Sequence, residues 1–159
     1  MVSTWAKKGS DVIFQGEFNN SIDLKGRASI PAKFREILAD SHGDEHLVVT
    51  KNSEGGLSAY PPSRWRKIVA QIQETPASQE KNAIIRLIVA PAVDCAFDKQ
   101  GRVLIPPSLR SHAGLEKEIV VVGMFEKIDV YSQLKYAEVT RRSEELLQGN
   151  PGFIASVGL

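Results

Sequence analysis

The chain has 159 residues, of which 42% are hydrophobic and 25% are charged, and its formal net charge at pH 7 is +1. This length and balance are typical of a soluble globular protein with one domain or two small ones that share a core. The single cysteine and the three separate histidines lack metal-site spacing, and no apolar run approaches the roughly 18 residues of a membrane span. Because the net charge is close to zero, any charge that binds nucleic acid must be local.

Residues 1–12 come first along the chain, and we expect them to form a flexible, polar N-terminal extension. They contain two lysines but lack the apolar stretch and the small-residue cleavage site of a secretory signal. Since the chain also has a single cysteine, we expect a reducing, cytoplasmic compartment, no membrane partner, and neither a metal nor another cofactor.

A motif of thirteen residues occurs twice in the chain. Residues 23–35, DLKGRASIPAKFR, align without gaps with residues 98–110, DKQGRVLIPPSLR, and six of the thirteen positions are identical. Two unrelated segments of average composition would share about one. The similarity resumes downstream, where residues 47–50 parallel residues 119–122. The pattern predicts a tandem duplication, with repeats at 17–64 and 93–136, a helical linker at 65–92, and a C-terminal helix and tail at 137–159.

Each repeat is expected to begin with a hairpin and to continue with a short helix. Glycine supplies the positive φ that a tight turn often requires, and proline ends a strand and is tolerated in the first turn of a helix. The corresponding elements are strands 17–23 and 93–98, turns 25–26 and 100–101, return strands 27–30 and 102–105, and helices 31–38 and 106–112, with Gly114 as a helix cap.

The second half of each repeat is expected to form a pair of strands. Residues 47–50 and 119–122 are apolar and β-branched, which suits buried strands, and residues 57–60 and 127–131 return as their partners. A β-α-β-β unit of this size is too small to stand alone, so two units should bury their apolar faces against each other. The expected fold is therefore α+β, with a mainly β, barrel-like core of pseudo-twofold symmetry.

Three further helices are expected around this core. Ser63 is a good N-cap for the first, whose apolar positions 65, 68, 69 and 72 form a stripe on one face. The second begins at Thr75-Pro76, and residues 84–89 are apolar nearly all round, so it should be buried within the fold or against another subunit. The third begins at Ser132 and stops at Gly149.

Positive charge is placed twice, at equivalent positions. Residues 23–36 and residues 98–110 each carry a formal charge of +2. Lysine and arginine at a hairpin tip suit a two-stranded ribbon that enters a major groove, where arginine pairs with guanine and lysine neutralises phosphate. An isolated charged turn could simply be solvated, but a duplicated turn that only reversed the chain would not need its arginine. The candidate DNA-contacting residues at the tips are Lys25, Arg27, Lys99 and Arg102.

The other repeated residues have different expected roles. Each motif aspartate lies four residues before its arginine, where it can accept backbone N–H groups or hold the guanidinium. Arg35 and Arg110 lie on the short helices, where each could contact phosphate or equally well bridge to an acidic residue. The residues expected to support the loops are Asp23, Gly26, Asp98 and Gly101.

Residues 13–150 resemble the MraZ family, in which one chain carries two SpoVT-AbrB-like domains. The similarity is carried by FQGEFNNSIDLKGRASIPAKFRE and by FDKQGRVLIPPSLRSHAGLEKEIVVVGMFEKIDVYS. It implies a swapped-hairpin, double-psi-like barrel and a ring-shaped homo-oligomer. The partner it implies is double-stranded promoter DNA, bound at direct repeats of the division and cell-wall gene cluster, usually as a repressor in the nucleoid. Departures are Gln15, where the family often has arginine, and Tyr136, where it usually has tryptophan.

Two other classes of function fit parts of the sequence. An aspartic hydrolase would use one aspartate from each half, but it needs a small hydroxyl residue and glycine after each, whereas Leu24 and Lys99 follow here. An antitoxin-like or purely assembling module would use the same apolar helices, yet such antitoxins are usually short chains with one unit and a disordered tail. We therefore expect a protein that is not an enzyme and has no small-molecule substrate.

Overall fold

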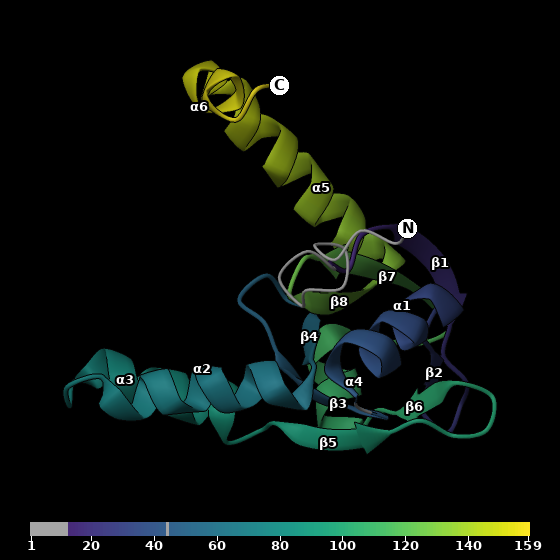
Figure 1. Cartoon of the computed structure of the whole chain (residues 1–159). Helices are drawn as coiled ribbons and strands as arrows, with labels where there is room; N and C mark the ends of the chain where they lie inside the picture. Colours follow the sequence, from purple (N-terminus) through teal and green to yellow (C-terminus); the bar gives the residue numbers. More distant parts are fainter. Residues whose placement is uncertain (1–12, 44) are drawn as a thin grey trace, which may run out of the picture.

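The computed structural model describes residues 13–43 and 45–159, so the extension expected at residues 1–12 lies outside the described residues (Figure 1). The first repeat contains β1 (Glu17–Ser21), β2 (Arg27–Ser29), α1 (Ala32–Ile37), the π-helical turn η3 (Leu38–His42), β3 (His46–Lys51) and β4 (Leu57–Tyr60). The second contains β5 (Val93–Ala96), β6 (Arg102–Leu104), α4 (Pro107–Ala113), β7 (Glu118–Met124) and β8 (Lys127–Ser132). Between and after them lie α2 (Pro62–Glu74), α3 (Gln79–Ile84), η4 (Ile85–Val89), α5 (Gln133–Gln148) and α6 (Pro151–Ser156).

The strands form a six-stranded antiparallel sheet in the order β1-β7-β8-β4-β3-β5 and a separate two-stranded ribbon of β2 and β6. The first strand of each repeat pairs with the third strand of the other repeat, β1 with β7 and β5 with β3. The order of the sheet is unchanged when the two repeats are exchanged, so a pseudo-twofold axis passes between the central strands β4 and β8. The expected duplication is thus built into the strand order.

The return strand of each hairpin leaves its own first strand. Instead, β2 pairs with β6 across the pseudo-twofold axis, where Ala28 lies opposite Val103. Single bridges, Ile22 with Ala28 and Phe97 with Val103, are what remains of the simple hairpins expected from the sequence. The turn is where the sequence predicted it. The strand that pairs with each return strand, however, lies about 75 residues away along the chain.

The expectation of a closed barrel is not met. The described strands give a mixed α and β fold with a mostly antiparallel sheet whose edges, β1 and β5, stay apart. The ribbon strands span only three residues each and pair with one another, so they form no continuous ladder that joins the two edges. The structure has the two expected repeats, but its sheet does not close into a barrel.

The hydrophobic core fills the space between one face of the sheet and the layer of α1, α4 and the ribbon (Figure 1). Phe34 of α1 and Leu109 of α4 occupy equivalent positions of the motif, and both are fully buried. The rings of Phe14 and Phe18 meet Phe34 edge-on, with centroids 5.7 and 5.2 Å away. The core therefore joins the two repeats and belongs to neither one alone.

The helices outside the repeats differ from expectation at their starts. Pro61 precedes α2 and Pro62 begins it, so Ser63 lies inside the helix, because proline is pre-organised for a first turn. The next helix begins at Gln79, after Ser78 accepts the N–H of Lys81 at 3.0 Å, and not at Thr75-Pro76. Ser132 does cap α5, and Gly149 ends it as expected, but Pro151 then opens the unexpected α6.

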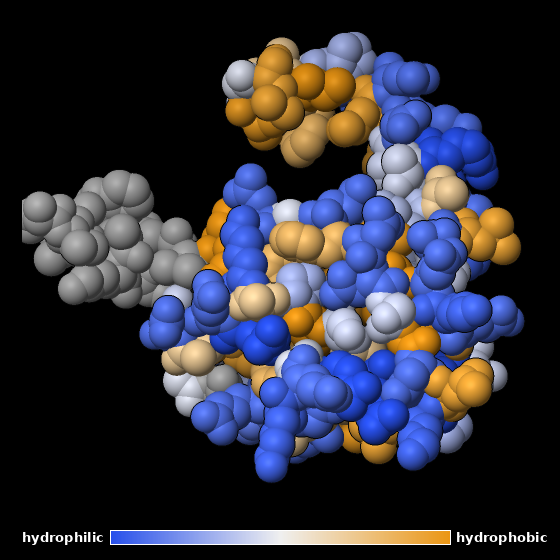
Figure 2. Space-filling model, turned by 90° about the vertical axis from the view of Figure 1, so that its right-hand side faces the viewer, coloured by the Kyte–Doolittle hydropathy of each residue, from blue (hydrophilic) through white to orange (hydrophobic). Residues whose placement is uncertain are grey.

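Two helical arms extend from the core, one formed by α2 and α3 and the other by α5 and α6 (Figure 1). In the first arm Ile84, Ile85 and Leu87 are 45, 38 and 56% exposed, so this apolar segment is not buried within the chain. The end of the second arm carries a further apolar surface (Figure 2), to which Leu146 and Phe153 contribute. None of the helices in residues 13–43 and 45–159 is long and apolar enough to cross a membrane.

Candidate nucleic-acid interface

Two equivalent loops carry the repeated motif, and in each an aspartate ties the turn to the arginine that follows. Asp23 Oδ1 accepts the backbone N–H groups of Lys25 and Arg27 at 3.0 and 2.9 Å, and its Oδ2 accepts Nε of Arg27 at 2.6 Å. Asp98 makes the same three contacts with Gln100 and Arg102, each at 2.9 Å. Each aspartate therefore joins the backbone of its turn to the guanidinium of the arginine that follows.

The electrostatics of the two aspartates follow from this geometry. The backbone N–H of Arg27 lowers the pKa of Asp23. Desolvation opposes this, and the Arg27 side chain and the Lys25 N–H lower the pKa further. The backbone N–H of Arg102 lowers the pKa of Asp98 in the same way. Both carboxylates are therefore stabilised in their charged form.

The ribbon brings the two arginines to one surface. Ala28 and Val103 point inward and are buried, so the alternate positions of β2 and β6 point outward. Arg27 lies opposite Leu104 and Arg102 lies opposite Ser29. A second contact couples the loops, because Nη1 of Arg102 lies 3.6 Å from Oδ2 of Asp23. Lys25 and Lys99 are exposed at the tips of the same loops.

Arg35 and Arg110 each make a contact that the sequence did not indicate. Their Nε atoms donate to the carbonyl oxygens of Ile30 and Ile105 at 3.2 and 3.0 Å, and no ion pair to an acidic side chain is found for them within residues 13–43 and 45–159. Each guanidinium instead packs under the loop of the other repeat. It supports that loop from below.

The turn glycines make this crossing contact possible. A methyl group at Gly101 would lie 2.5 Å from Cζ of Arg35, and one at Gly26 would lie 2.6 Å from Nε of Arg110. Both glycines also have positive φ, +91° at Gly26 and +76° at Gly101. The sequence accounts for the backbone angle, whereas the close approach across repeats has no local signal.

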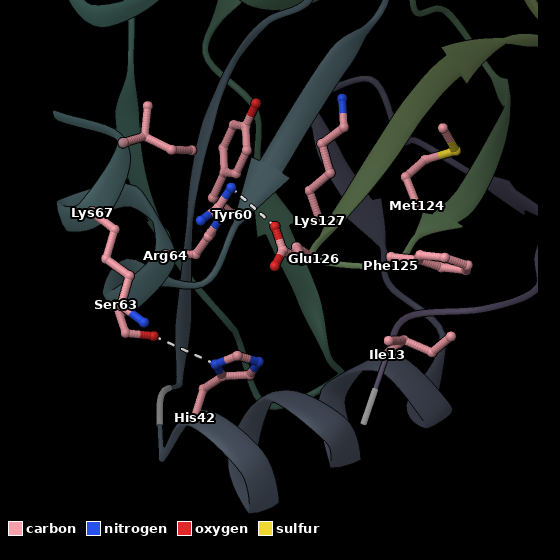
Figure 3. A pocket seen from close by; sticks show the side chains of 11 residues that line it. Ile13, His42, Tyr60, Ser63, Arg64, Lys67, Met124, Phe125, Glu126 and Lys127 are labelled. Carbon is pink, nitrogen blue, oxygen red and sulfur yellow. Dashed lines mark hydrogen bonds and ion pairs between the residues drawn. The ribbon is translucent and has the colours of Figure 1, made fainter. Parts of the chain in front are cut away.

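A separate hollow of about 700 Å³ lies beside the start of α2 and the turn between β7 and β8 (Figure 3). Arg64 from α2 pairs with Glu126 from the turn at 2.9 Å, and Lys127 reaches the buried Asp129 at 3.2 Å. No residue of the repeated motif lines this hollow, and no sequence signal pointed to it. The described residues also hold no group of three His, Cys, Asp or Glu side chains suited to a metal ion.

The comparisons with known proteins agree with the duplicated motif. The family described as "MraZ protein, putative antitoxin-like" matches two tandem regions, residues 13–87 and 88–149. The chain belongs to the MraZ family. It is 47% identical to the transcriptional regulator MraZ of Syntrophotalea carbinolica over 91% of this chain and 98% of the relative. It is 37% identical to that of Geobacter sulfurreducens over 92% and 100%, and 41% identical to that of Geotalea daltonii over the same shares.

The crossing contact in this MraZ-family chain predicts coupling between Gly101 and Arg35. Gly114→Ala, at φ +63° with open space around it, should cost only the backbone strain of about 1 to 2 kcal/mol in the free energy of unfolding. Gly101→Ala should cost about 2 to 4 kcal/mol, because it also expels the guanidinium from its hydrogen bond. Urea unfolding of Gly101→Ala, Arg35→Ala and the double variant measures this coupling. If the losses in unfolding free energy of the two single variants add up to that of the double variant, the contact is contradicted.

The lowered pKa values of Asp23 and Asp98 predict a loss of stability in acid. A carboxyl group whose pKa is lower in the folded state stabilises the fold above its unfolded pKa of about 3.9, and this contribution disappears as the pH falls through the folded value. The Asp23→Asn/Asp98→Asn variant should therefore show a flatter loss of stability below about pH 4 than the unaltered chain. Urea unfolding at a series of pH values tests this, and parallel profiles for the two proteins would rule it out.

Proposed function

We propose that this MraZ-family chain is a sequence-specific, DNA-binding transcriptional regulator that reads double-stranded promoter DNA with its two basic loops. The relatives that match nearly its full length are named transcriptional regulators. The observation that carries the proposal is the β2–β6 ribbon, which presents Arg27 and Arg102 on one outward face. A two-stranded ribbon of this kind fits the major groove of B-DNA.

The loop geometry suits direct reading of bases. Asp23 engages Arg27 through Nε, and within the described part of the chain no hydrogen bond or ion pair of the two Arg27 Nη atoms is found. An arginine held in this way is pre-organised to donate two hydrogen bonds to O6 and N7 of guanine. Lys25 and Lys99 at the tips are placed to neutralise phosphates. Arg35 and Arg110 support the opposite loop, and we propose that each also contacts phosphate.

We further propose that the protein assembles into a ring that binds direct repeats in the promoter of the division and cell-wall gene cluster as a nucleoid-associated repressor. The cluster, repression and ring rest on the family resemblance. Two different apolar surfaces, on the α2–α3 arm and the α5–α6 arm, support head-to-tail contacts between copies, which close into rings when the rotation allows. Several subunits on spaced repeats would multiply a modest affinity.

We also propose bounds for the two repeats and the two arms. The strand exchange supports structural repeats at residues 17–64 and 93–136 that fold only together, with residues 65–92 and 137–159 as the assembling arms. The exchanged strands are also what an opened form of the swapped-hairpin SpoVT-AbrB arrangement would show.

The two alternatives from the sequence are less well supported. An aspartic dyad needs two carboxyl groups that share a proton, whereas Asp23 and Asp98 are each paired with an arginine that favours the charged form. The family description does include the word antitoxin-like. Specific DNA binding by the purified chain, without a second protein, distinguishes a regulator from such a module.

Arg27→Ala should abolish specific binding, because each engaged subunit loses a bidentate pair worth about 1 to 3 kcal/mol. A gel-shift titration on a footprinted duplex from the chain's own upstream region measures this. Arg64→Ala, which removes an exposed ion pair with Glu126 away from the ribbon, is the matched control and should bind normally. Binding by the unaltered chain should weaken with salt at a log–log slope of about −0.9 per neutralised phosphate. An undiminished shift for Arg27→Ala would refute its assignment.

Leu87→Glu should lower the native mass of the assembly, because it places a charge in an apolar surface that another copy would bury. Asn82→Glu, at an exposed polar residue of α3, is the control and should keep the native mass. Native mass spectrometry of both variants decides the point. If Leu87→Glu assembles like the unaltered chain, the α2–α3 arm is not the contact.

A further inference from the structure

Two exposed leucines lie near Arg27, one in its own loop and one opposite it in the ribbon. Leu24 lies in the turn of the first loop with 98% of its surface exposed. Leu104 is directly opposite Arg27 in the β2–β6 ladder and is 58% exposed. Single exposed leucines are common on protein surfaces, but Leu104 shares the outward face of the ribbon with the proposed reading arginine, and Leu24 lies three residues before that arginine in the same loop. Both leucines therefore belong to the candidate interface.

The other half of the ribbon has polar residues at the equivalent positions. In the gap-free alignment of the motif, Lys99 corresponds to Leu24, and Ser29 corresponds to Leu104. Arg102 consequently lies opposite Ser29, beside a loop whose tip carries a lysine. The backbone of the ribbon is pseudo-symmetric, whereas its outward chemistry is not. The Arg27 half is cationic and apolar, and the Arg102 half is cationic and polar.

The major groove offers one apolar feature to such a surface, the 5-methyl group of thymine. We propose that Leu24 and Leu104 are specificity-determining residues that contact thymine methyl groups beside the base pair read by Arg27. This inference rests on the proposed function and deepens it. The Arg27 half then reads guanine next to thymine, and the Arg102 half reads its base pair without this preference.

An asymmetric reading surface has a consequence for the DNA site. If the two halves of one ribbon prefer different base pairs, each subunit binds its site in one orientation only. Copies of the site that are read by successive subunits must then share that orientation. The residue pairs Leu24–Lys99 and Leu104–Ser29 provide this polarity from within a single chain.

The experiment uses the full chain and a random duplex library. Sequences that bind are enriched, and each thymine of the enriched site is then replaced by deoxyuridine, which removes only the methyl group. We expect one or two positions beside the essential guanine at which deoxyuridine weakens binding about three- to fivefold, the effect of one buried methyl group. Leu24→Ala and Leu104→Ala should each bring the affinities for thymine and deoxyuridine together at one of these positions.

Leu134→Ala is the matched control, because Leu134 is a 78% exposed leucine on α5, outside the ribbon, and this variant should keep the discrimination. Circular dichroism checks that the variants fold. The inference is overturned if deoxyuridine binds as well as thymine at every position, or if both leucine variants keep the full discrimination. If the library yields no enriched sequence at all, the proposed function fails as well, and the two failures are thus distinguished.

Discussion

The pairing of β2 with β6 is the contact on which the rest of the structure depends. Ala28 and Val103 meet on the pseudo-twofold axis, and their small and β-branched side chains let two short strands approach at the centre of the core. Because each ribbon strand comes from a different repeat, neither repeat can complete its hairpin or bury its apolar face alone. Folding and formation of the candidate interface are therefore one event.

The crossing of Arg35 under Gly101 and of Arg110 under Gly26 extends this dependence to the loops. Each loop is held from within by its own aspartate and from below by the other repeat's arginine. Rigid loops lose little conformational entropy on binding, which favours selective contacts with DNA over non-specific attraction in a chain whose net charge is only +1. The apolar arms are free of this constraint and extend from the core (Figure 1).

The predictions from the sequence were right where the signal was local and repeated. The motif aspartates lie four residues before the arginines they hold, and Ser132 and Gly149 bound α5 as expected. They were wrong where neighbouring residues competed to begin a helix, and they missed contacts that depend on a distant partner. The expected starts at Ser63 and Thr75-Pro76 were displaced by neighbouring residues that are equally good at beginning a helix. The packing of Arg35 under Gly101 was missed because this glycine belongs to the other repeat.

The sequence by itself determined the duplication, the turns, the support of each arginine by its aspartate and the local concentration of positive charge. These properties depend on residues within about one turn of each other, or on identity between repeats, both of which can be seen in a single chain. Only the tertiary structure decided which strand each return strand joins, that the sheet stays open, and that Leu104 lies opposite Arg27. Such choices depend on packing between residues far apart in sequence, and the periodicity of a three-residue strand does not encode its partner.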